Sequence, residues 1–256
     1  YMIQSKNKRG AAAALIACAA LLAVIVLLEN ASVFLPASNV PNLLKPTSQL
    51  FAVLKKGAVY SLAAVSMNLL NGFTGLFSLG QAGFMLLGAY TYAILSVPVA
   101  DRAAVYYLYG GSAVNFSFQD LFGSLFGREG LGGAVSMGLG VVAALILGGC
   151  VAAVFACLIG LPVLRLKSDY LAIATLGFAE VVRAVFQWGK LGPVTNGSNP
   201  LKSFVRINSF QLKLGGTTIS LTTFVPVLLA TVCIGLIVLL VNSTYGRAFK
   251  AIRDDE

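Results

Sequence analysis

The stretch LGGAVSMGLGVVAALILGGCVAAVFACLIGLPVL, residues 131–164, decides the fold class of this chain. It runs for 34 positions without a charged residue. As a helix it would extend about 51 Å at ~1.5 Å per residue, whereas the hydrocarbon core of a bilayer is ~30 Å thick. The stretch therefore predicts one membrane-spanning helix, with the remaining residues at an interface or in a loop.

Three further apolar runs have the same character. Residues 11–28 are just long enough for one crossing, residues 57–100 must fold back at least once, and residues 214–246 exceed one crossing. We expect six spans, near residues 11–28, 52–71, 82–98, 134–160, 170–188 and 222–242. The predicted fold is an all-α, polytopic transmembrane helix bundle, in which residues 1–256 form a single transmembrane domain.

The composition excludes several classes of protein. Only 11% of the residues are charged and 58% are hydrophobic, whereas soluble domains are ~25% charged. The net charge of +9 is explained by basic residues that face anionic lipid headgroups, so no nucleic-acid partner is inferred. The chain has no histidine, and its four cysteines lie in apolar runs without C-x-x-C spacing. We therefore expect no enzyme, no metal site and no cofactor.

Two readings remain open for the first apolar run. The cations Lys6, Lys8 and Arg9 precede it, as in a secretory signal peptide. The 18 uncharged residues that follow exceed an ordinary signal sequence, and no clear cleavage pattern comes before Glu29. This favours a helix that is retained.

The distribution of cations suggests an orientation. With the N-terminus inside, residues 161–169 and 243–256 face the cytoplasm, and loops 29–51, 99–130 and 189–221 face outside. The positive-inside rule supports this only in part, because loop 189–221 carries four basic residues and no acid.

The passage from Ser66 to Phe84 is polar and rich in glycine within an otherwise apolar run. Glycines allow close backbone approach or a break in a helix, and such breaks occur at membrane depth only where protein or a cavity covers them. The passage is interpreted either as the lining of a transport pathway or as a short cytoplasmic turn with small-residue packing. The pathway candidates here are Asn68, Asn71, Gly72, Gly75, Gln81 and Gly83.

A second informative passage runs from Leu161 to Arg183. Counted from Tyr170, Glu180 lies ~15 Å along a helix, near the middle of the membrane, where ionisable groups are costly and usually functional. Arg183 follows three residues later on the same face, so Glu180 and Arg183 are alternatively a structural pair that neutralises itself. Asp169 stands where a helix N-cap belongs.

The third passage runs from Tyr245 to Glu256. As a helix it would present Ala248, Ala251 and Ile252 on one face and its charged residues elsewhere. Such a helix either lies on the membrane surface or docks a cytoplasmic partner.

At these three passages the sequence resembles the branched-chain amino acid ABC transporter permeases, specifically the LivM-type subunit. The resemblance runs from about Val53 to Glu256 and rests on Leu164-Arg-Leu, Asp169-Tyr-Leu, Thr175-Leu-Gly-Phe178, Ser78-Leu-Gly-Gln-Ala-Gly-Phe84 and Gly246-Arg-Ala-Phe-Lys-Ala-Ile-Arg-Asp-Asp-Glu256. The last segment is similar to the start of the family's cytoplasmic coupling loop, residues 243–256. Ser168, residues 195–201 and the outer residues 101–130 depart from the family's pattern.

The resemblance implies a membrane subunit of an importer. Two permease chains, this one and a second of the LivH kind, would form the pathway, two cytoplasmic ATPase subunits would drive it, and an external binding protein would deliver substrate. Coupling to the ATPase would fall on Gly246, Arg247, Ala248, Ala251, Ile252, Arg253, Asp254, Asp255 and Glu256, and Thr175 and Glu180 join the pathway candidates. The chain contains no G-x-x-x-x-G-K-[ST] phosphate loop, so ATP would be handled by another chain.

The expected location is the bacterial or archaeal cell (inner) membrane. The chain begins with Tyr1 before Met2 and stops within a charged segment, so we expect the natural protein to continue. A secondary transporter, an intramembrane enzyme, and an importer of urea or short amides are the alternatives. The lack of histidine, of G-x-S-x-G and of paired intramembrane carboxylates argues against the enzyme.

Overall fold

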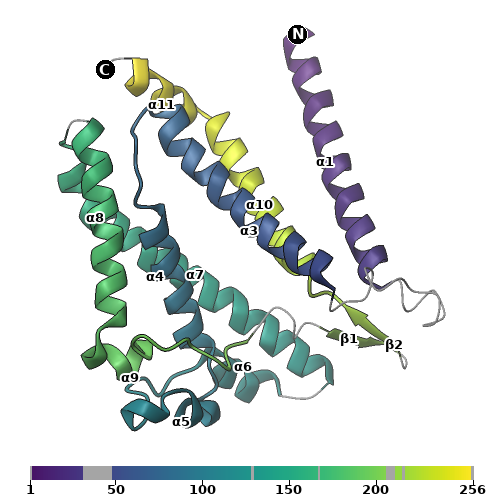
Figure 1. Cartoon of the computed structure of the whole chain (residues 1–256). Helices are drawn as coiled ribbons and strands as arrows, with labels where there is room; N and C mark the ends of the chain where they lie inside the picture. The colour runs from purple at the N-terminus through teal and green to yellow at the C-terminus, as the bar shows by residue number, and fades with distance from the viewer. Residues whose placement is uncertain are drawn as a thin grey trace. The chain divides into compact units, whose positions relative to one another are not determined.

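The computed structural model describes residues 2–30, 48–127, 130–166, 168–205, 211–214 and 217–254. The described chain is predominantly helical, and each of the six predicted spans is a helix (Figure 1). These helices are α1 (Met2–Glu29), α3 (Gln49–Asn68), α4 (Gln81–Ser96), α7 (Gly130–Val163), α8 (Ser168–Gln187) and α10 (Phe224–Val241). The prediction of an all-α, polytopic helix bundle is confirmed.

Within the described residues, four helical stretches are long and apolar enough to cross a membrane: Gln49–Phe73, Val135–Val163, Tyr170–Gln187 and Phe224–Val241. Helix α4 and residues 99–105 meet at 98° and would form a fifth span if this bent pair counts as one. The apolar part of α1, Ile16–Glu29, is shorter. Large apolar side chains such as Leu161 and Leu239 are 73% and 68% exposed, which suits contact with lipid or with other membrane subunits. The chain is a multi-pass membrane protein.

The chain falls into two compact units, residues 1–69 with 207–251, and residues 70–206 with 252–256. In the first unit, α3 and α10 run side by side, and α1 contacts α10 (Figure 1). A two-stranded antiparallel hairpin, β1 (Gln211–Leu214) and β2 (Thr217–Ser220), precedes α10 and pairs Gln211 with Ser220. The apolar runs of the sequence do not predict this hairpin.

The end of α1 is held to the start of α10 by buried polar groups. Both carboxylate oxygens of Glu29 accept from the backbone amide of Thr223 at 3.1 Å, and one also accepts from the Thr222 hydroxyl. Asn30 donates to the Ser220 carbonyl at 3.0 Å and accepts from its amide at 2.8 Å. Glu29 is fully buried, and its negative charge is favourable at a helix N-terminus, where backbone amides lack carbonyl partners.

In the second unit, α4 packs against both α7 and α8, while α6 (Phe118–Phe126) packs on α7. Glycines bring α4 and α7 together, because a Cβ at Gly148 would lie 3.1 Å from the Gly88 carbonyl oxygen. The buried Ser117 caps α6 by accepting from the Gln119 amide at 3.2 Å. The second unit thus packs α4 closely against two other apolar helices, α7 and α8.

The segment between α4 and α6 is ordered around one buried cation. It contains η4 (Val99–Asp101), α5 (Arg102–Val105) and η5 (Tyr107–Tyr109). Two other short helices, η6 (Gly189–Leu191) and α9 (Gly192–Thr195), follow α8. Arg102 is 2% exposed, and its guanidinium donates to the Ser112 hydroxyl and to the carbonyls of Ile94, Val114 and Phe116. The Tyr106 hydroxyl donates to the Val194 carbonyl at 2.9 Å. Burial raises the pKa of Tyr106, although the nearby Arg102 charge opposes this, so the phenol remains a donor at neutral pH.

Candidate functional site

A break in the helical structure precedes α4. Helix α3 continues into a π-helical turn, η3 (Leu69–Phe73), and the chain is then non-helical until α4 begins at Gln81. We call residues 70–80, which comprise most of this π-turn and the non-helical residues after it, the helix break. Such π-turns are frequent at functional sites, and non-helical backbone at membrane depth requires protein or a cavity around it. The predicted polar passage of residues 66–84 therefore contains a real interruption.

Side chains replace the hydrogen bonds that a continuous helix would make. Asn71 Oδ1 accepts from the Ser78 amide at 3.2 Å, and the buried Thr74 hydroxyl donates to the Leu70 carbonyl. Ser78 Oγ accepts from the Gly80 amide at 3.4 Å. Side chains of the break thus bind backbone groups of the same segment. This explains why Asn, Thr and Ser occur in an otherwise apolar run.

Helix α8 holds the break through Thr175. The Thr175 hydroxyl is buried, accepts from the Leu79 amide at 3.0 Å and donates to the Ala172 carbonyl at 3.0 Å. A Cβ at Gly80 would lie 3.1 Å from Thr175, and one at Gly83 would lie 2.9 Å from the Ala179 Cα. Both glycines therefore allow the start of α4 to approach α8 at backbone distance.

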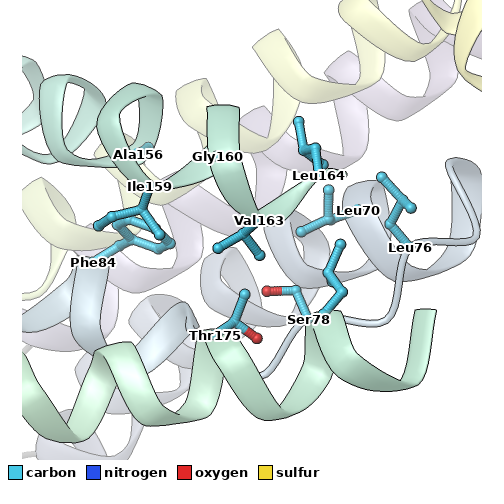
Figure 2. A pocket seen from close by; sticks show the side chains of 11 residues that line it. Leu70, Leu76, Ser78, Phe84, Ala156, Ile159, Gly160, Val163, Leu164 and Thr175 are labelled. Carbon is cyan, nitrogen blue, oxygen red and sulfur yellow. The ribbon is translucent and has the colours of Figure 1, made fainter. Parts of the chain in front are cut away.

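A cavity of about 220 Å³ lies beside the break (Figure 2). In Figure 2, Phe84, Ala156 and Ile159 are seen on one side, and Leu70, Leu76 and Leu164 on the other, with Val163, Ser78 and Thr175 between them. The described residues that line it come from the break, α4, α7, α8 and the turn between the last two helices: Leu70, Leu76, Ser78, Phe84, Ala156, Ile159, Gly160, Val163, Leu164, Leu171 and Thr175. None of these is charged, and Ser78 and Thr175 supply the side-chain hydroxyls. The cavity can accept an aliphatic group with one polar edge.

The structure brings several of the sequence candidates together. Asn71, Gly72 and Gly75 lie in the break, Thr175 contacts it from α8, and Gly83 lies in the contact between α4 and α8. Gln81 is the first residue of α4, next to the break. Asn68 is exposed at the end of α3 and is not among the residues that line the cavity.

Glu180 and Arg183 lie on α8, outside the cavity lining. Arg183 Nε donates to Glu180 Oε2 at 2.9 Å, and the Arg183 Nη2 to Glu180 Oε2 distance is 2.8 Å. The side chains are 59% and 57% exposed for Glu180 and Arg183 respectively. The ion pair forms within α8, and both side chains lie on the surface of the chain and not in its interior.

The predicted coupling segment is helix α11 (Thr244–Asp254), which follows α10 after a two-residue turn. Gly246 is buried, whereas Arg247, Ala248, Ala251 and Arg253 are exposed. The guanidinium of Arg253 (Nη1) donates to the Gly72 carbonyl at 3.4 Å. The side chains of Ile252 and Asp254, and the whole of Asp255 and Glu256, lie outside the described residues.

Most residues that line the cavity were not among the candidates predicted from the sequence. Helix α7 contributes Ala156, Ile159, Gly160 and Val163, but this helix is apolar on every face, so periodicity offers no way to choose a functional side. Ser78 begins the Ser78-Leu-Gly-Gln-Ala-Gly-Phe84 segment that resembles the family, but the resemblance does not mark it as a lining residue. A local signal for it exists in the sequence, because a serine side chain can accept from the backbone amide two residues later, as Ser78 does from Gly80.

Comparisons with known proteins identify the family of the chain. A family model described as the permease component of the branched-chain amino acid transport system matches residues 49–256. The high-affinity branched-chain amino acid transport system permease protein LivM of Salmonella typhimurium is 28% identical over 219 residues, covering 77% of this chain and 42% of that protein. LivM of Escherichia coli matches with the same identity and coverage. The chain thus spans less than half the length of these curated relatives, and no solved structure matches it significantly. The match to four fifths of the residues shows that this chain belongs to the family of branched-chain amino acid transport system permease components.

Proposed function

We propose that this chain is a permease subunit of a binding-protein-dependent ABC importer that moves branched-chain amino acids by ATPase-driven alternating access. The observation that carries the proposal is the aliphatic cavity built against a break in the helical structure. The partners are a second permease subunit of the LivH kind, two cytoplasmic ATPase subunits and an external binding protein. The assembly lies in the cell (inner) membrane of a bacterium or archaeon.

The lining of the cavity matches an aliphatic side chain. Burial of a four-carbon branched group stabilises a complex by roughly 3 kcal/mol, at ~0.8 kcal/mol per carbon. The described lining offers no charge to the ammonium and carboxylate groups of an amino acid, so residence should be brief. A site of this kind suits passage of substrate, while strong and selective binding is left to the external protein. Urea, which has no apolar part, gains nothing from such a lining.

Helix α11 is proposed as the docking element for the ATPase. Its exposed Ala248 and Ala251 permit close approach of a partner, and the exposed Arg247 supplies positive charge. Movement of the ATPase subunits would then be passed to the helices of this chain. The absence of a phosphate loop from the sequence agrees with ATP being bound elsewhere.

Reconstitution of the complete transporter tests the proposal. Proteoliposomes that contain both permease subunits, the ATPase and the binding protein should accumulate labelled leucine only when ATP is present, and should not accumulate labelled urea. Leucine uptake that persists without ATP, and responds to an ion gradient, would instead establish a secondary transporter.

A cavity-filling variant tests the site itself. Gly160 lines the cavity, and a Cβ there would meet no atom within 4 Å, so the side chain of Gly160→Leu can start without a backbone clash and should fill part of the cavity. Gly149 on the same helix is equally open and does not line the cavity, which makes Gly149→Leu the matched control. We expect strongly reduced leucine uptake for Gly160→Leu at unchanged membrane levels. Equal uptake by the two variants would exclude the cavity from the pathway.

An Ala251→Glu variant tests docking. A carboxylate placed in an interface without a partner costs several kcal/mol, so the ATPase should co-purify poorly while membrane insertion stays normal. Ala251→Gln, of the same size and uncharged, is the control. Normal ATP-driven uptake by Ala251→Glu would remove this face from the ATPase interface.

A further inference from the structure

The helix break has contacts of two kinds. Through Leu70, Leu76 and Ser78 it forms part of the cavity wall. Through Gly72 and Gly75 it contacts Arg253, in the last turn of α11. A single segment of eleven residues therefore joins the proposed substrate cavity to the end of the proposed coupling helix.

The Arg253 contact is close and depends on glycine. A Cβ at Gly75 would lie 2.9 Å from Arg253 Cγ, 3.7 Å from its Cβ and 3.8 Å from its Cδ. Gly75 also has a φ of +75°, a conformation that residues with a side chain rarely adopt. The aliphatic part of Arg253 thus lies directly against the backbone of the break, in space that only a glycine leaves open.

The guanidinium of Arg253 stabilises the carbonyl end of a helix. The helix formed by α3 and η3 ends at Phe73, and the carbonyls of a last helical turn lack amide partners within the helix. They also carry the negative end of the helix dipole, so a cation placed there is favourable. Arg253 supplies both a donor and a positive charge at the Gly72 carbonyl.

The break is able to respond to movement of this contact. Its backbone is held by the Asn71 to Ser78, Thr74 to Leu70 and Thr175 to Leu79 hydrogen bonds, and not by a continuous helical ladder. A displacement of Arg253 therefore moves Gly72 and Gly75, and with them the residues that face the cavity.

We propose that Arg253 is a positioning residue that links α11 to the helix break, so that movement of α11 reshapes the wall of the cavity. The proposal rests on the proposed function, because only that function places a moving ATPase at α11. The contact itself is a property of the chain and can be tested separately from transport.

A cysteine pair tests the contact. Disulfides form at Cβ to Cβ distances of ~3.5–4.5 Å, and the corresponding distance between positions 75 and 253 is 3.7 Å. In a background without the native cysteines Cys18, Cys150, Cys157 and Cys233, the Gly75→Cys/Arg253→Cys protein in its assembled transporter should cross-link under mild oxidation. Each single variant is the control and should not give this product. Failure of the pair to cross-link, in a protein that reaches the membrane, would overturn the proposed contact.

The coupling role is tested by comparing leucine uptake with ATP hydrolysis. For Arg253→Ala we expect a normal amount of assembled transporter and continued ATP hydrolysis, with uptake per ATP hydrolysed reduced ~5-fold or more, the lower end of typical coupling between sites. Arg253→Lys, which keeps the charge and a donor, should recover part of the loss. A merely structural residue would lower assembly and hydrolysis together and leave their ratio to uptake unchanged, which would overturn the proposal.

The outcomes separate the two proposals. If the unmodified transporter shows no ATP-driven leucine uptake, the proposed function fails, whatever the cysteine pair does. If uptake is normal but Arg253→Ala has an unchanged ratio of uptake to hydrolysis, only the role of Arg253 fails. Loss of ATPase co-purification in Arg253→Ala would make this residue part of the docking surface and would also overturn the positioning role.

Discussion

Replacement of Gly83 by alanine should separate α4 from α8. The added Cβ would lie 2.9 Å from the Ala179 Cα, 3.2 Å from its Cβ and 3.3 Å from Phe178 Cε1. Because the nearest atom belongs to backbone, no side-chain rotation relieves the clash, and overpacking of this kind costs ~1–3 kcal/mol. The Phe84 and Phe178 rings, whose centroids are 5.4 Å apart, would be displaced with the backbone.

Gly88 provides the matched control for this prediction. It lies five residues later on the same helix, and a Cβ there would meet nothing within 4 Å. Both variants gain helix propensity, by up to ~1 kcal/mol, so the difference between them isolates the steric cost. Unfolding of the purified chain in detergent micelles, followed by circular dichroism during denaturant titration, should show Gly83→Ala to be less stable than Gly88→Ala by ~1–3 kcal/mol. Equal stability of the two variants would refute the close contact of α4 and α8.

Three further outcomes are expected. A double-mutant cycle of Glu180→Gln and Arg183→Gln should give a coupling of ~0.5–3 kcal/mol in unfolding free energy, because the two side chains form one ion pair at 2.8 Å; zero coupling would dismiss the pair as a stabilising interaction. Glu29→Ala should destabilise the chain by ~1.5–3 kcal/mol, since it removes charged hydrogen bonds to buried donors, and a thermal melt unchanged from the parent would contradict this. In a cysteine-free background, Tyr107→Cys should react with an impermeant thiol reagent added outside intact cells and Leu164→Cys should not; the opposite pattern would invert the proposed orientation.

The positions of the long helices could be predicted because they depend on apolar run length. The expected span near residues 222–242 is observed as Phe224–Val241, and that near 170–188 as Ser168–Gln187. Hydrophobic length is a local property of sequence, and the bilayer thickness sets its scale. Packing between helices is not needed to find it.

The contacts between helices could not be predicted from the sequence. The Thr175 to Leu79 hydrogen bond joins residues 96 positions apart. The sequence marks Thr175 as a pathway candidate, but it does not indicate which backbone group the hydroxyl binds. Arg102 belongs to loop 99–130, which is predicted to face outside, and nothing in the sequence indicates that its side chain is buried among carbonyl groups. The β1–β2 hairpin did have a local signal, because Gly215-Gly216 separates two short segments with β-prone residues.

The contact between Glu29 and Thr222 has a consequence for biosynthesis. The two residues are separated by 193 positions, and a ribosome adds ~5–20 residues per second. After Glu29 has been synthesised, ~10–40 s therefore pass before its partner exists. During this interval the carboxylate must stay hydrated or contact lipid headgroups, which keeps the end of α1 at the membrane surface while the intervening helices are inserted. The polar contacts between Glu29 and the start of α10 form only after residues 222 and 223 have been synthesised, so a nascent chain released earlier would keep α1 without this anchor.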